Sequence, residues 1–567
     1  MTPKQAFKNF FPCGLLTLFY CSALGAQSTQ VECKAEFTPA PGGYQFAKEH
    51  SKKYAIPEGS HVGEVHYTQL EIFDESDPRE NNWLYRWANR FHIETKTRVI
   101  ESQTLVESGD NYDPRLVAET ARLLRQRKYL YDADVRPVSQ CDDTVDLEII
   151  TRDVWSFTPE VSFKRSGGEN TYRLTLRDTN ILGSGREVSV GVKKDLDRRS
   201  NQFVYKDNNV RGSRVAGRVL YSDNDDGSEQ LVFVQLPFYA LDTRRSWRVR
   251  YQKFEQIDTQ FFKGNDVSEV NHEREDYLLS YGFSRGLVDG KTRRWALGYR
   301  FRDDRFGPGD ELPPPSEFPI DRRLSFPFIE YTSVVDDFTT ATNLNQIHRI
   351  EDLHLGHSLF TRLGFAASAF GSDSDRIVWE GEFNDTIVYN GNVWWRHELE
   401  WTGLWNLDTD KPEEIIIDYQ MRYFKNQTSH RSFFASFNAV YTKNLNTNQQ
   451  VLFGGDTGAR GFQNRLQAGD RRIVLTVEER LYTDIHLLNL FRLGWTIFAD
   501  VGKAWEPGVE SGFEDDYLAN VGFGIRLAST KADAGRVIHI DFAFPVTNRD
   551  DDEVNSSEIS IKIKNQF

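Results

Sequence analysis

The chain has 567 residues and a formal net charge of −15. It is longer than one compact soluble domain, and without a basic run or patch it is poorly suited to bind nucleic acid. Its mean hydropathy of −0.57 excludes a bundle of transmembrane helices. A transmembrane β-barrel is compatible with this value, because only alternate residues of its strands face lipid.

Residues 1–26 have the pattern of a secretory signal peptide. A basic start is followed by a mostly apolar run over residues 10–24, which is too short to span a bilayer as a helix, and by a small-x-small cleavage site. Removal of this segment leaves Cys33 and Cys141 as the cysteines of the mature chain, in an oxidising compartment. We therefore predict that these two cysteines form a disulfide.

Residues 27–60 are polar and contain proline and glycine, which predicts a loose lead-in, whereas residues 61–155 predict one small α/β domain. In this domain, apolar residues recur at helical spacing over 79–93 and again after Asp113-Pro114, a pair typical of a helix start. The predicted elements in chain order are a strand at 62–73, helices at 79–93, at 97–106 and from 113 onward, and strands at 129–138 and 145–151.

Over residues 156–567 the helical period disappears, and short runs of alternating apolar and polar residues recur. A strand has a side-chain period of two, so this alternation predicts strands with one face toward lipid and the other toward a polar lumen. Between about 16 and 20 such runs can be counted. Polar or proline-rich stretches between the runs predict long outer loops at 255–275, 304–321 and 335–352.

Residues 451–505 carry the most informative pattern, a glycine-rich loop followed by two strands. Strand parity places the acids of these strands, Glu478 and Asp500, on the lumen side. A buried Arg460 at the loop tip would need an acidic partner there. The residues that we assign to this loop latch are Gly454, Gly455, Arg460, Gly461, Phe462, Glu478, Arg480, Asp500 and Gly502.

These motifs resemble the BamA/TamA outer-membrane assembly superfamily, also called the bacterial surface antigen barrel. The pattern of that family is a Gly-Gly loop ending in Arg-Gly-aromatic, then a strand with Glu-x-Arg, then a strand with Phe-x-Asp-x-Gly, and all three occur here in order. Ala459 departs from the pattern, since a branched apolar residue is frequent at that place. Residues 177–185 resemble the early-barrel motif of the same superfamily. The resemblance implies 16 strands, with Arg460 folded into the lumen and paired with Asp500 or Glu478.

Residues 61–155 resemble a POTRA domain, the periplasmic module of that superfamily. The motifs that carry this resemblance are Val99-Ile100, Gly109-Asp110-x-Tyr112, Arg122-Leu123-Leu124 and Tyr129-Leu130-Tyr131. The helix predicted at 79–93 is extra to the family's pattern. The expected fold is therefore an all-β transmembrane β-barrel of about 16 antiparallel strands, preceded by one small α/β POTRA domain.

The two ends of the barrel sequence predict a weak seam. Pro159 near the start of the first strand cannot donate to the hydrogen-bond ladder. The last strand ends on Phe567, which resembles the outer-membrane insertion signal, but Asn565 puts a polar side chain at a lipid-facing position. We expect the first and last strands to part more easily than other pairs.

Catalytic motifs are missing from the sequence. It contains no Gly-x-Ser-x-Gly elbow, no phosphate loop, no His-Glu-x-x-His and no metal-ligand spacing of Cys or His. We therefore expect no enzymatic activity and no cofactor.

The resemblance implies an outer-membrane barrel that inserts or assembles other outer-membrane proteins or translocates polypeptide, with its N-terminal domain in the periplasm. Two alternatives stay open at this point. One is a secretion pore of the two-partner type, and the other is a passive barrel or surface antigen without transport activity. The implied partners are outer-membrane lipids, unfolded outer-membrane or secreted polypeptides, and a periplasmic or inner-membrane partner bound by the POTRA domain.

Overall fold

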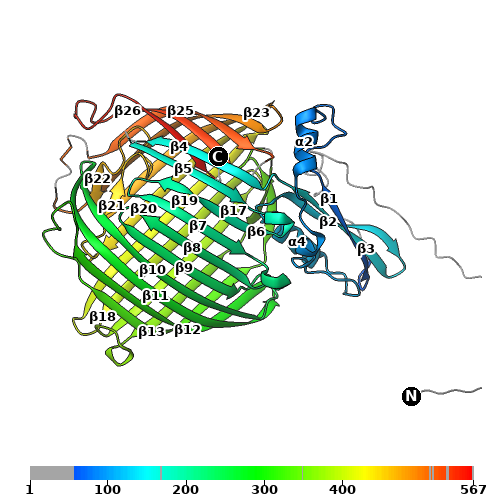
Figure 1. Cartoon of the computed structure of the whole chain (residues 1–567), viewed down its shortest axis with the longest axis horizontal. Helices are drawn as coiled ribbons and strands as arrows, with labels where there is room; N and C mark the ends of the chain where they lie inside the picture. The colour runs from blue at the N-terminus through cyan, green and yellow to red at the C-terminus, as the bar shows by residue number, and fades with distance from the viewer. Residues whose placement is uncertain are drawn as a thin grey trace, which may run out of the picture.

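The computed structural model describes residues 56–564 apart from 167–168, 348, 510–511, 514–515 and 532–535. The predicted signal peptide, Cys33, Asn565 and Phe567 lie outside the described residues. The described chain forms a large barrel with a small α/β domain at one of its two mouths (Figure 1). We call this mouth the domain-side mouth and the opposite one the far mouth.

The α/β domain contains a three-stranded sheet with the order β1-β3-β2, in which β1 is parallel to β3 and β2 is antiparallel to it. Asp113 starts the last helix as predicted, since its carboxylate accepts a hydrogen bond from Arg115 N at 2.8 Å and proline follows it. The second helix ends at Glu101, earlier than predicted. The elements are β1 (His61–Leu70), α2 (Trp83–Phe91), α3 (Thr97–Glu101), α4 (Pro114–Arg125), β2 (Leu130–Cys141) and β3 (Thr144–Asp153).

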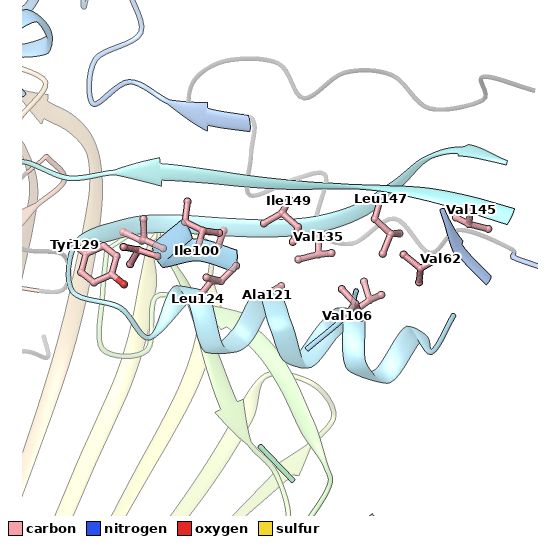
Figure 2. Close-up of a cluster of buried hydrophobic side chains, with 14 residues drawn as sticks. Val62, Ile100, Val106, Ala121, Leu124, Tyr129, Val135, Val145, Leu147 and Ile149 are labelled. Carbon is pink, nitrogen blue, oxygen red and sulfur yellow. The ribbon is translucent and has the colours of Figure 1, made fainter. Parts of the chain in front are cut away.

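The core of the domain lies between the sheet and helix α4. Ala121 and Leu124 of α4 point toward the strands that carry Val135, Leu147 and Ile149 (Figure 2). Fully burying a side chain such as Leu124 contributes about 1.5–3 kcal/mol, so this core holds the helix on the sheet. Cys141 at the end of β2 is disulfide-bonded. Its partner lies outside the described residues, and the pairing with Cys33 stays a prediction.

The barrel is closed by 20 strands, so the number of 16 implied by the resemblance is wrong. Side-chain alternation marks each strand, but strand number is set by tilt and stagger around the whole barrel, which a local pattern does not contain. The barrel strands are β4 (Phe157–Ser166), β5 (Glu169–Asp178), β6 (Arg186–Lys194), β7 (Arg199–Asp207), β8 (Ala216–Asn224), β9 (Gly227–Leu236), β10 (Arg245–Phe262), β11 (Asn265–Val288), β12 (Lys291–Pro308), β13 (Arg322–Val335), β16 (Ser358–Ala366), β17 (Arg376–Tyr389), β18 (Val393–Asn406), β19 (Lys411–Thr428), β20 (Arg431–Lys443), β23 (Arg471–Leu487), β24 (Phe491–Trp505), β25 (Leu518–Ser529), β26 (Val537–Pro545) and β27 (Glu558–Lys564).

The barrel strands are apolar outside and more polar inside, as the alternation predicts. In β24, Trp495 and Ile497 are exposed on the outer face, whereas Thr496 and Asp500 are buried on the inner face. Short 3-10 turns lie in three connections, η1 (Ile181–Gly183), η2 (Val210–Gly212) and η3 (Ser368–Phe370). None of the helices in the described ranges is long and apolar enough to cross a membrane.

Two of the three predicted outer loops are wrong. Residues 255–275 are mostly the paired ends of β10 and β11, because a polar strand can continue a ladder beyond the apolar zone. Residues 335–352 lie at the domain-side mouth, where they contribute to a small hairpin of β14 (Phe338–Thr342) and β15 (Ile350–His354). Of the stretch 304–321, the first part extends β12 and the rest is a connection at the far mouth.

Candidate functional site

The long connection between β20 and β23 folds from the far mouth against the inner wall of the barrel. Its ends pair as β21 (Val451–Phe453) and β22 (Gln467–Gly469). Gly454 is required here, since a Cβ on it would lie 2.4 Å from Gln463 O. An apolar cluster fixes the loop on the wall strands, and its members are Phe453, Ala459, Phe462, Leu466, Val474, Ala504, Leu518 and Val554.

Arg460 at the tip of this loop latch is held by two carboxylates of the wall. Its Nε and Nη2 donate to the two oxygens of Asp500 at 2.8 Å each, and its Nη1 donates to Glu478 Oε1 at 2.8 Å. The guanidinium also lies 3.4 Å above the centre of the Phe498 ring. Both acids that strand parity and the resemblance point to are thus in contact with Arg460, and the bidentate geometry fixes the loop tip in one orientation.

The neighbours of this ion pair complete its hydrogen bonding. Asp500 also accepts from Thr476 Oγ1 at 2.8 Å and from Asn520 Nδ2 at 2.9 Å. Gly461 abuts Asn520 and Pro545, and a Cβ on Gly502 would lie 2.8 Å from the Phe453 ring of the loop, so both glycines allow the close approach of loop and wall. A buried ion pair with all its groups satisfied specifies one position of the loop.

A second segment, which the sequence did not predict, enters the barrel from the domain-side mouth. It is the β14–β15 hairpin, whose tip side chains Leu344 and Ile347 are each 2% exposed. Leu344 packs against Trp394 and Phe424, and Ile347 packs in a cluster with Tyr482. Apolar residues spaced along the otherwise polar stretch 335–352 were the only local sign that it has a buried position.

The hairpin tip is held in shape by a carboxylate of its own. Glu351 accepts hydrogen bonds from the backbone N–H groups of Leu344, Asn345 and Gln346 at 2.9–3.1 Å. Three donors on one carboxylate fix the turn before it meets the wall. The tip is therefore a formed structure inside the lumen.

The two inserted segments meet at one ion-pair network. Arg480 Nε donates to Glu478 Oε2 at 2.9 Å, and Arg480 Nη1 donates to Leu344 O at 3.1 Å. One oxygen of Glu478 therefore accepts from Arg460 of the latch. The other oxygen accepts from Arg480, which also binds the hairpin. The latch and the hairpin are thus linked through a single buried carboxylate.

The α/β domain holds the base of the hairpin. Arg125 of α4 donates to both oxygens of Asp352, at 2.8 and 2.5 Å, and Arg122 lies 3.6 Å above the Phe338 ring. Just before β15, Arg349 donates to Tyr131 O at 3.2 Å. The hairpin therefore bridges the domain and the lumen.

Other contacts fix the domain to the turns around the domain-side mouth. Glu119 accepts from Leu241 N in the β9–β10 turn at 2.9 Å. In the motif at 177–185, Asn180 Nδ2 donates to Thr95 Oγ1 at 2.8 Å, and a Cβ on Gly183, whose φ is +67°, would lie 2.1 Å from Glu94 O. This early-barrel motif therefore forms part of the docking surface for the domain.

Lys531, in the connection between β25 and β26, makes a further buried docking contact at the same mouth. Its Nζ donates to Glu80 Oε2 at 2.9 Å and to Ile72 O at 3.0 Å, and it lies 2.8 Å from Glu80 Oε1 in the same ion pair. Burial lowers the pKa of the Lys531 ammonium to about 8, while the Glu80 carboxylate acts in the other direction. At neutral pH the Lys531 amine is therefore mostly protonated.

The seam of the barrel lies between β27 and β4, which neighbour each other in the closed sheet. Pro159 pairs with Leu176 of β5 on the other side of β4, and its ring removes one donor from the first strand. Asn565 and Phe567, the other two seam residues, lie outside the described residues.

In the part of the chain that the structure describes, no group of three His, Cys, Asp or Glu residues could hold a metal ion.

A closed antiparallel barrel, with an Arg-Gly-Phe loop latched to its inner wall and an α/β domain at its mouth, defines the class of a transmembrane β-barrel with an appended α/β module. Residues 370–567 match the model of the Omp85 superfamily domain. Residues 370–567 thus form an Omp85 superfamily domain, and over this part of the chain the superfamily predicted from the motifs is confirmed.

Solved structures of similar proteins share little sequence with this chain. BamA from Haemophilus ducreyi lacking POTRA domains 1–3 is 12% identical, with 89% of this chain and 84% of that chain covered and a TM-score of 0.39. CdiB from Acinetobacter baumannii is 10% identical, with 88% and 73% covered and a TM-score of 0.44. CdiB from Escherichia coli is 11% identical, with 89% and 76% covered and a TM-score of 0.45. No curated protein matches the sequence.

Proposed function

We propose that this protein inserts other β-barrel proteins into the outer membrane, with the seam between β27 and β4 as the exit for the client. The observation that carries this proposal is that the lumen is entered from both mouths, by the latch and by the β14–β15 hairpin. A client that arrives at the domain-side mouth finds the hairpin and the docked domain in its way. The lateral route through the seam avoids them.

The barrel strands near the seam are short. Strands β5–β9 and β26 have 9 or 10 residues each, whereas β10–β13 on the other side have 14 to 24. A tilted transmembrane strand needs about 9–11 residues, so the seam side has no surplus of ladder hydrogen bonds. A short wall also thins the adjacent bilayer. Both properties favour opening of the seam and entry of a new strand.

The α/β domain supplies a place for an unfolded client. Its sheet ends on β1 and β2, and a free sheet edge can add an extended peptide as a further strand. In this proposal the domain lies in the periplasm, where it meets unfolded outer-membrane proteins and a periplasmic or inner-membrane partner. The work requires outer-membrane lipids, but it requires no catalytic group and no cofactor.

A secretion pore of the two-partner type is the second candidate. The observation that favours it is the strand number, because barrel diameter grows with strand number and 20 strands leave a wide lumen once the hairpin withdraws. The third candidate is a passive barrel or surface antigen, in which the seam would stay closed and the hairpin would stay in the lumen.

Two reversible disulfide locks separate these candidates. One lock is a set of cysteine pairs between β4 and β27, and the other joins Ile347→Cys in the hairpin tip to Ala528→Cys in the same packed cluster. The assay is insertion of an urea-unfolded small outer-membrane barrel into vesicles that contain the locked protein. An inserting protein should stop when the seam is locked, continue when the hairpin is locked, and recover with reductant. If only the hairpin lock blocks passage of polypeptide, the protein is a pore, and if neither lock matters, the barrel is passive.

A further inference from the structure

Helix α2 carries an aromatic face that the domain does not cover. Trp83, Trp87 and Phe91 lie at positions i, i+4 and i+8, which share one side of a helix, and they are 73%, 50% and 59% exposed. Leu84 and Ile93 beside them are also exposed. A contiguous exposed apolar patch on a water-facing domain marks a surface that another molecule covers.

This exposure is not caused by a loose helix. On the opposite face, Tyr85 stacks on Phe73 with the ring centroids 4.2 Å apart, and Asn89 exchanges hydrogen bonds of 3.1 and 2.9 Å with the backbone of Phe73. The side chain of Asn82 caps the helix start, accepting from two backbone N–H groups at 3.0 Å. The aromatic face therefore cannot turn inward without breaking these contacts.

The helix lies at the rim of the domain-side mouth (Figure 1). Tyr85 Oη donates to Leu488 O in the β23–β24 turn, and Asn489 Nδ2 donates to Arg79 O just before the helix at 2.9 Å. At the other end of the helix, Phe91 lines a surface hollow together with Phe157 and Leu182 of the barrel. Helix α2 is thus attached to the barrel ends on the side that contains the seam.

The aromatic face continues the lipid-facing surface of the barrel. Phe157 lies two residues before Pro159, which pairs with Leu176, so Phe157 and Leu176 share the outer face of the wall, and both are exposed. The tips of the nearby turns carry Leu182 and Leu488, which are 63% and 78% exposed. The same apolar surface therefore runs from the wall across these turns to helix α2.

We propose that helix α2 is an interfacial membrane helix, with the phospholipid leaflet at the domain-side mouth as its partner. Trp83, Trp87 and Phe91 would enter the boundary between headgroups and acyl chains, where aromatic rings are favoured. Arg86 and Arg90 are exposed along one edge of the aromatic stripe, at the place where a guanidinium can reach a lipid phosphate. The leaflet would then hold the domain at the barrel rim, beside the seam.

Spin-label depth measurements on the full-length protein in phosphatidylcholine vesicles, with and without phosphatidylglycerol, test this proposal. A nitroxide at Trp87→Cys should be relaxed by oxygen and protected from a water-soluble nickel chelate, as a label at the lipid-facing Leu297→Cys is. A label at Glu107→Cys, an exposed position of the same domain, supplies the water-facing reference. The proposal is wrong if the label at residue 87 is as open to the nickel chelate as the label at residue 107.

A second variant tests the role of the two arginines. In the parent protein, we expect phosphatidylglycerol to draw the label at residue 87 deeper into the membrane. In the double variant Arg86→Gln/Arg90→Gln, phosphatidylglycerol should no longer change the depth of this label. Lysine at both positions should restore the deeper position. An unchanged depth in the glutamine variant would overturn the phosphate contact. Labels that become buried only after an unfolded client is added would show that the face binds protein instead. Insertion of a client is not read in the depth measurement, so its outcome is independent of the proposed function.

Discussion

Arg460 is the residue on which the position of the loop latch depends most. It is 8% exposed, and it satisfies two carboxylates that are themselves buried. Removing one partner of a buried ion pair leaves an uncompensated charge, which destabilises a protein far more than the loss of an exposed pair does.

We predict that Arg460→Ala lowers the free energy of unfolding by roughly 3–5 kcal/mol. Lysine at this position should recover part of the loss, because it keeps the charge but not the bidentate geometry. The measurement is the urea midpoint of the barrel in detergent, followed by its mobility in gels with and without heating. Arg305→Ala, which breaks the more exposed pair with Asp303, is the matched control and should cost about 0–1 kcal/mol. Equal midpoints for the two variants would contradict the prediction.

The link between the latch and the hairpin can also be measured at single residues. Leu344 anchors the hairpin tip, and its backbone carbonyl accepts a hydrogen bond from Arg480. Arg480 also donates to Glu478, which accepts from Arg460 with its other oxygen. Residues in one such network show coupling of about 0.5–3 kcal/mol in double-mutant cycles. We therefore expect Arg460→Ala and Leu344→Ala to be non-additive in unfolding.

The control cycle combines Arg460→Ala with Leu278→Ala. Leu278 is buried in a separate apolar cluster of the wall, so these two changes should add within experimental error. Additive behaviour in both cycles would show that the latch and the hairpin are energetically independent.

At the scale of elements, the docking of the α/β domain depends on side chains that cross to the barrel turns. Lys531 is one of these, and its partner Glu80 is 1% exposed. Docking fixes the base of the hairpin through α4, so a weakened contact should loosen several elements together.

We predict that Lys531→Ala increases hydrogen exchange in α2 and in the β23–β24 turn, because Glu80 is left buried without its ammonium partner. Adding Glu80→Gln should restore part of the protection, since the buried group is then neutral. Lys411→Ala, at an exposed lysine of the far mouth, should leave exchange in these segments unchanged. The prediction is wrong if Lys531→Ala and Lys411→Ala give the same exchange pattern.

For the whole molecule, the size of the open lumen depends on how much of the barrel interior the hairpin fills. A barrel of 20 strands encloses more space than its own wall side chains fill. The latch and the hairpin take up part of this space, and the domain covers one mouth.

We predict that replacing residues 338–354 by a short turn raises the single-channel conductance in planar bilayers and lowers the unfolding midpoint, because two apolar clusters lose their hairpin members. Shortening the connection at 309–321, which lies at the far mouth, is the control. Conductance that is the same in the wild type and in the hairpin deletion would show that the hairpin does not restrict the pore.

Much of the candidate site could be predicted from sequence because it depends on local rules. A strand alternates its side chains whatever its neighbours are, so Glu478 and Asp500 had to share the lumen side, and a buried Arg460 then needed them. The start of α4 at Asp113-Pro114 is equally local, since the cap and the proline act within one helical turn. The residue pattern and the resemblance together were sufficient for the barrel, the domain and the latch.

The rest was decided by contacts between residues far apart in the chain. The count of 20 strands depends on how every ladder is tilted and staggered around the closed barrel. The polar stretch at 255–275 is strand because β10 and β11 pair along it, and the stretch at 335–352 enters the lumen because Leu344 and Ile347 find apolar partners on β18, β19, β23, β25 and β26. A local sequence pattern does not contain such partners, because they are brought together only when the barrel closes.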